Sequence, residues 1–101
     1  MKTTIVIIIM FTSLLFSQTN IVPALKDIEQ GDLIGARTKL GTLLAKFPSD
    51  PSVNFLDAVL TEDGVEAVNK YTQIFNQYPQ NQYADAALYR TFSYYYSFFL
   101  V

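Results

Sequence analysis

The pattern of apolar positions between residues 31 and 79 occurs twice along the chain. A small residue is followed by large apolar residues four, seven and eleven positions later and then by a proline, as in Ala36, Leu40, Leu43, Phe47, Pro48 and again in Ala67, Tyr71, Ile74, Tyr78, Pro79. This spacing places the apolar residues on one face of an α-helix, and the proline ends that helix. Each copy therefore predicts the second helix of a helical hairpin, and the offset of 31 residues predicts hairpins in tandem.

Turn and capping residues divide the remaining chain into helices. Asp32 and Asp50 are placed to cap the helices that follow them, and Pro51 fits a first helical position. Gly35 and Gly41 each cost a helix about 1 kcal/mol relative to alanine, a cost that is tolerable where they let a neighbouring helix approach closely. We expect an all-α protein of helical hairpin repeats whose five helices cover about 20–30, 32–47, 51–61, 65–78 and 82–101, the last of them without a companion.

The N-terminus has the pattern of a secretory signal peptide. Lys2 precedes an apolar run that ends at Phe16, and a short polar exit follows. This run is shorter than the roughly 20 apolar residues of a bilayer-spanning helix. We expect cleavage after Ser17, with cleavage after Gln18 as the alternative. Cleavage after Ser17 divides the chain into a signal peptide (1–17) and a repeat domain (18–101) that is incomplete at its C-terminus. The protein is then exported, to the periplasm in a bacterium; the alternative is an uncleaved segment that holds it to the inner membrane.

Composition and charge exclude several classes of function. The chain has seven basic residues, one of them Lys2 of the signal peptide, against nine acidic ones. The mature chain is therefore acidic, which gives no reason to expect nucleic acid or an anionic membrane as a partner. The chain has neither cysteine nor histidine. Disulfides, thiolate or histidine metal ligands and the usual nucleophile–base pairs are therefore absent from its chemistry.

Carboxylates are the remaining candidates for acid–base or metal chemistry. They gather in two places, at Glu62, Asp63 and Glu66 and at Asp27, Glu29 and Asp32. Exposed carboxylates at a turn before a helix favour the positive end of the helix dipole and lack the burial that tunes a catalytic pKa. We expect both groups to be solvated turns, so the sequence predicts no catalytic, cofactor-binding or metal-binding residue and no enzyme.

The last predicted helix is unusually rich in aromatic residues. Eight aromatic side chains lie between Tyr83 and Phe99, and each ring can bury about 150–250 Å². A fifth helix without a companion would leave some of this area open. Three occupants remain possible at this stage: a continuation of the chain, a second copy, or a dedicated ligand. The candidate partner surface comprises Val53, Phe55, Leu56, Tyr89, Phe92, Tyr95, Tyr96 and Phe99.

The repeated hairpin pattern resembles the tetratricopeptide repeat (TPR) family. That family places a small residue where the second helix crosses the first, large residues four and seven positions on, and a closing proline, which Ala36, Leu40, Leu43 and Pro48 match, as do Ala67, Tyr71, Ile74 and Pro79. Ala58 stands where the family has a small residue on the first helix. The chain departs from the family in lacking an opening Trp-x-x-Leu-Gly and in its offset of 31 residues, where about 34 is usual.

Residues 76–89 are similar to the repeats of bacterial cell-envelope proteins, of the Tol–Pal-associated and SPOR types. The whole resemblance covers about 31–96 and implies protein–protein scaffolding without catalytic residues. We therefore expect a non-catalytic scaffold or adaptor of the cell envelope that presents the concave surface of its first helices to a protein partner. The alternative is the N-terminal fragment of a longer envelope protein whose activity, such as peptidoglycan binding, lies beyond Val101. Lys39 and Lys70, at equivalent positions, either face an acidic partner or mark the solvated side of their helices.

Overall fold

The computed structural model describes residues 19–99, and these residues form an all-α fold, as the sequence predicts. The signal peptide expected at residues 1–17 lies outside the described residues. Helices account for every regular element in this range: α2 (Val22–Glu29), α3 (Leu33–Lys46), α4 (Pro51–Leu60), α5 (Gly64–Gln77) and α6 (Ala84–Phe99). Their number and order confirm the predicted elements.

Aspartates at three helix starts explain where these helices begin. The Asp32 carboxylate accepts a hydrogen bond from the Gly35 amide at 2.9 Å, and Asp50 accepts from the Ser52 amide at 2.8 Å. Asp63 accepts from the Val65 amide at 3.0 Å at the start of α5. Each carboxylate satisfies an amide that has no partner within its own helix. The caps predicted at Asp32 and Asp50 are therefore confirmed.

The two copies of the sequence pattern also end in the same backbone conformation. Phe47 at the end of α3 has φ −135° and ψ 64°, and Tyr78 at the end of α5 has φ −131° and ψ 58°. The Phe47 amide donates to the Leu43 carbonyl and the Tyr78 amide to the Ile74 carbonyl. A residue before proline is pushed out of the α region, so Pro48 and Pro79 end their helices in the same way.

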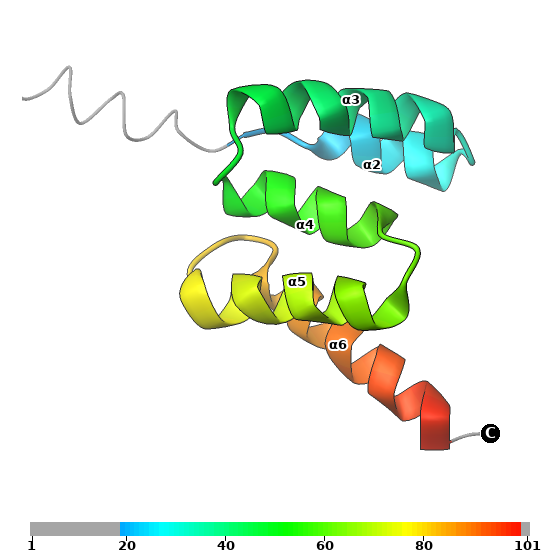
Figure 1. Cartoon of the computed structure of the whole chain (residues 1–101), viewed down its shortest axis with the longest axis vertical. Coiled ribbons are helices and arrows are strands. Elements are labelled where there is room, and N and C mark those ends of the chain that lie inside the picture. The colour runs from blue at the N-terminus through cyan, green and yellow to red at the C-terminus, as the bar shows by residue number, and fades with distance from the viewer. Residues whose placement is uncertain (1–18, 100–101) are drawn as a thin grey trace, which may run out of the picture.

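The helices follow one another as a stack (Figure 1). Helix α3 packs on α2, α4 on α3, α5 on α4, and α6 on α5; in Figure 1, α6 crosses behind α5 and its last turns extend past it. The buried core runs from Ile21 through α4 to Ala87. The small residues Ala36, Ala58 and Ala67 are all buried, as are Leu40, Tyr71 and Ile74, whereas Leu43 is half-buried and Pro48 and Pro79 are exposed.

Equivalent ion pairs occur in the first and second hairpins. Lys39 on α3 forms an ion pair with Asp27 on α2, and Lys70 on α5 pairs with Asp57 on α4 at 3.1 Å. Each lysine thus joins the second helix of a hairpin to the first helix of the same hairpin. Such partly exposed pairs contribute at most about 1 kcal/mol each, but they show that both lysines contact carboxylates of this chain.

A second polar set marks the edge where successive hairpins begin. The Thr19 hydroxyl donates to the Asp50 carboxylate at 2.7 Å, across 31 residues of sequence. Asn81, a further 31 residues on, accepts from the Tyr83 amide at 2.8 Å and donates to the Ser52 hydroxyl at 3.2 Å. Thr19, Asp50 and Asn81 therefore occupy one repeat position. Counting one repeat offset of 31 residues back from Asp50 would have identified Thr19 as the equivalent position from the sequence alone.

Gly41 does not have the role expected of it. The residue is exposed on α3, and a Cβ added there would meet no atom within 4 Å. The expectation that it lets a neighbouring helix approach is therefore wrong for this position. At Gly35 an added Cβ would meet the Asp32 carboxylate that caps the same helix, so the tight contact there is with the cap and not with another helix.

Candidate interaction surfaces

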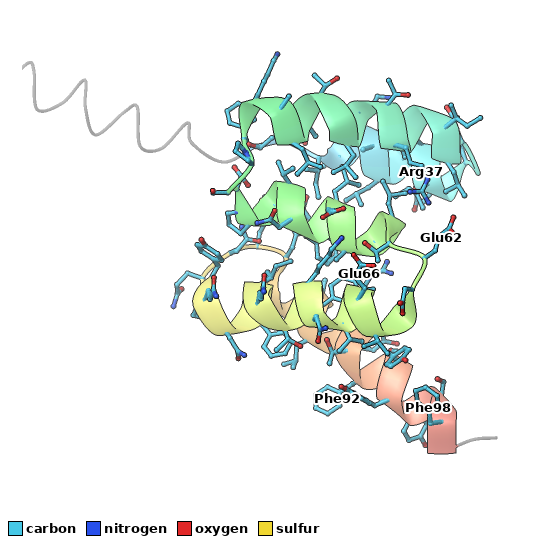
Figure 2. The ribbon with its side chains drawn as sticks, viewed as in Figure 1. Arg37, Glu62, Glu66, Phe92 and Phe98 are labelled. Atoms are coloured by element: carbon cyan, nitrogen blue, oxygen red, sulfur yellow. The ribbon has the colours of Figure 1, made fainter. Side chains whose placement is uncertain are left out.

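The two groups of carboxylates are dispersed among different partners. Glu62 approaches Arg37 of α3 at 3.4 Å (Figure 2), and Glu66 approaches Lys70 of α5 at 3.6 Å. Asp63 caps α5, and in the other group Asp27 pairs with Lys39 while Asp32 caps α3. Within residues 19–99, no three acidic side chains converge on a point where a metal ion could sit.

Three residues expected on the partner surface belong to the core instead. Val53, Phe55 and Leu56 are only 0%, 3% and 0% exposed. Helix α4 lies between α3 and α5, and the Tyr83 ring and the Arg90 guanidinium cover Phe55. A helix that is apolar nearly all round needs neighbours on several sides, and here the chain itself supplies them. The assignment to a partner surface is therefore wrong for Val53 and Leu56, whereas Phe55 lines the groove described below.

The aromatic residues of α6 remain exposed. Tyr89, Phe92, Tyr95 and Tyr96 are 72%, 67%, 52% and 62% exposed, and Leu88 beside them is 39% exposed. We call these five residues the aromatic face. Phe98, which was not selected from the sequence, is also exposed and lies near the end of α6 (Figure 2). The side chain of Phe99 lies outside the described part of the chain.

A second side of α6 is fixed to α5. Ala84 and Ala87 are buried there, and the ring of Tyr94 lies so close to Gly64 that a Cβ at Gly64 would collide with it. Gly64 is the first residue of α5. Because Gly64 has no side chain, the Tyr94 ring can pack against the start of α5. This contact fixes the position of the last turns of α6.

The third side of α6 closes a groove with α2 and α4. We call it the inner groove; it has a volume of about 480 Å³. Helix α2 contributes Leu25 and Ile28 with the charged Lys26 and Glu29, α4 contributes Phe55 and Val59, and α6 contributes Ala86 and Arg90, with Tyr83 just before it. These are the first helices of the successive hairpins, from which the sequence analysis expected a partner surface, and of the residues selected there Phe55 lines the groove.

Arg90 is the notable charge of the inner groove. Its guanidinium carbon lies 5.9 Å from the centre of the Phe55 ring, and the Tyr83 ring stacks on the same ring at 4.9 Å. No salt bridge within the described residues involves Arg90. Burial raises the pKa of Tyr71, which packs on Phe55 from α5, and the charge of Arg90 opposes this rise. The inner groove therefore presents the positive charge of Arg90 next to an aromatic floor, the stacked rings of Phe55 and Tyr83.

None of the described helices combines the length and the apolar character needed to cross a bilayer.

Searches against known proteins found no matching family model, no matching curated protein and no matching solved structure. Function therefore has to be inferred from the inner groove and the aromatic face.

Proposed function

We propose that this chain is a non-catalytic interaction module, a TPR-like scaffold or adaptor that holds a segment of a partner protein in its inner groove. The observation that carries the proposal is the groove itself, formed by α2, α4 and α6, with Arg90 held against its aromatic floor. Grooves formed between helices are common sites for ligands and peptides. The repeated hairpins explain how a short chain builds such a groove from helices that are distant in sequence.

The chemistry of the groove indicates the kind of segment it would accept. Leu25 and Ile28 of α2 offer apolar contact, and Lys26 and Glu29 balance each other in charge. Arg90 adds a positive charge that forms no salt bridge within residues 19–99. A guanidinium binds carboxylates through two parallel hydrogen bonds. The expected partner segment carries apolar side chains next to an aspartate, a glutamate or a terminal carboxylate.

Selection from a randomised peptide library against the purified protein tests this proposal. We expect enriched peptides to combine an acidic group with apolar residues. Replacing Arg90 with glutamine should weaken their binding about tenfold or more, because a hydrogen bond to a charged group contributes about 1.5–3 kcal/mol. The control is Lys46→Gln, which makes the same change in net charge on the exposed end of α3. Equal binding to wild type and Arg90→Gln, measured by isothermal titration calorimetry, would refute the role of the groove.

We also propose that the module acts in the bacterial cell envelope, in the periplasm. The support is the signal-peptide pattern of residues 1–17 and the similarity of residues 76–89 to envelope repeats. Mass spectrometry of the protein expressed in bacteria should then find an N-terminus at Gln18 or, for the alternative cleavage site, at Thr19. A protein that keeps Met1 and fractionates with membranes would instead support an uncleaved anchor, and one that stays in the cytoplasm would refute export.

A further inference from the structure

The aromatic face lies apart from the inner groove. Successive residues of an α-helix turn by about 100°, so Phe92 and Tyr95 lie on the side of α6 opposite Ala86 and Arg90, which line the groove. No helix of the described chain covers this side, because Leu88, Phe92 and Tyr95 all remain exposed. A partner in the groove would leave the aromatic face uncovered.

The spacing of the aromatic face is that of a helix–helix seam. Leu88, Phe92 and Tyr95 are separated by four and then three residues, and Tyr89 and Tyr96 flank this line seven residues apart. Alternating steps of three and four residues keep one line of side chains directed toward a partner helix packed nearly parallel or antiparallel. The face is therefore shaped to receive a helix.

The charge of the face favours a partner with the same surface. No charged residue occurs between Thr91 and Phe99, and the one charge on the same side of α6, Asp85, lies one turn before Leu88 at the start of the helix. Two copies that meet along Phe92 and Tyr95 therefore bring no like charges together at the centre of the seam. Aromatic pairs prefer edge-on contacts, and such contacts already occur on α6, where the Tyr94 ring meets Tyr95 at 71° and Phe98 at 85°.

The area is sufficient for a dimer. At exposures between 39% and 72%, the five residues of the aromatic face offer about 580 Å², taking about 200 Å² for each side chain. Two copies would cover about 1,150 Å², above the roughly 1,000 Å² that a specific interface needs. One copy alone would expose an apolar area at the upper end of the range for the largest patch of a typical monomer, which is about 300–600 Å².

From these observations we infer that the aromatic face binds a second copy of this chain, with the two α6 helices packed antiparallel about a two-fold axis. A two-fold interface uses the same patch on both copies. The last turns of α6 extend past α5 (Figure 1), so a second α6 can approach them without meeting α2–α4 of the first copy. The resulting dimer would carry two inner grooves.

Sedimentation equilibrium over a concentration series tests this inference. Wild type should be a dimer, and Phe92→Lys should weaken the association at least tenfold, because it places like charges in the seam. Tyr96→Lys, one turn further, provides a second variant in case the first folds poorly. The matched control is Ser93→Lys, which introduces the same charge at the neighbouring exposed position outside the seam and should remain dimeric. Circular dichroism checks that each variant keeps its helices.

Three results would overturn the inference: a wild type that stays monomeric throughout, a Phe92→Lys variant that dimerises like wild type, or a Ser93→Lys variant that is disrupted equally. A monomer that binds the dye ANS would show that the face is open to some other occupant. The test is independent of the inner groove, since Arg90→Gln should change peptide binding and leave the oligomeric state unaltered.

Discussion

Replacing Leu56 with alanine is expected to lower the free energy of unfolding by about 2–5 kcal/mol, the usual cost of removing a fully buried leucine side chain. Leu56 is 0% exposed and lies in α4, which packs between α3 and α5. Domains of this size are stabilised by only about 5–10 kcal/mol, so the variant would lose a large part of its stability. Urea denaturation followed by circular dichroism at 222 nm provides the measurement.

The matched control for this prediction is Leu33→Ala. Leu33 is 49% exposed at the start of α3, so the same change of side chain should cost less than about 1 kcal/mol. Equal costs at the two positions would mean that α4 presents Leu56 to solvent. That result would restore Leu56 to the partner surface from which its burial removes it.

The second large effect is expected from Ala87→Glu, which should release α6 and leave the preceding helices folded. Ala87 is 0% exposed on the side of α6 that faces α5. A carboxylate buried there without a partner costs several kcal/mol, and detaching α6 restores its hydration. Stacked helical repeats contact mainly their nearest neighbours, so α2–α5 should keep their packing. Amide hydrogen exchange should show lost protection in α6 alone.

Tyr89→Glu is the control for the release of α6. Tyr89 lies two residues further along the same helix and is 72% exposed, so its replacement should leave amide protection in α6 unchanged when measured at a concentration where the protein is monomeric. If Ala87→Glu instead unfolds the whole chain in one transition, α6 is an integral part of a single cooperative unit. If it changes nothing, Ala87 does not face α5.

Both proposed interactions depend on α6, through different sides of the same helix. Tyr83 and Arg90 contribute to the inner groove, whereas Phe92 and Tyr95 belong to the aromatic face. A variant that releases α6 should therefore weaken peptide binding and self-association together, whereas Arg90→Gln and Phe92→Lys should separate the two. The contact between the Tyr94 ring and Gly64 holds α6 in the orientation that separates the inner groove from the aromatic face.

Local chemistry explains why much of the fold follows from the sequence alone. The spacing from Ala36 to Phe47 and its repetition 31 residues later are relations within single helices, where side chains three and four positions apart necessarily share a face. Caps such as Asp32 act over two or three residues, and proline constrains the residue before it. Helix number, approximate bounds and hairpin pairing were therefore readable before any tertiary contact was known.

Tertiary structure decided which sides of these helices remain open. Helix α4 is apolar nearly all round, so its own pattern could not show that α3 and α5 lie on either side of it, or that Tyr83 and Arg90 cover Phe55. The pattern of α6 likewise could not show which of its three sides contacts α5, lines the groove or faces outward. Periodicity records which residues share a side of a helix. The exposure of that side depends on neighbours that are distant in the chain, and their positions are set only when the whole stack packs.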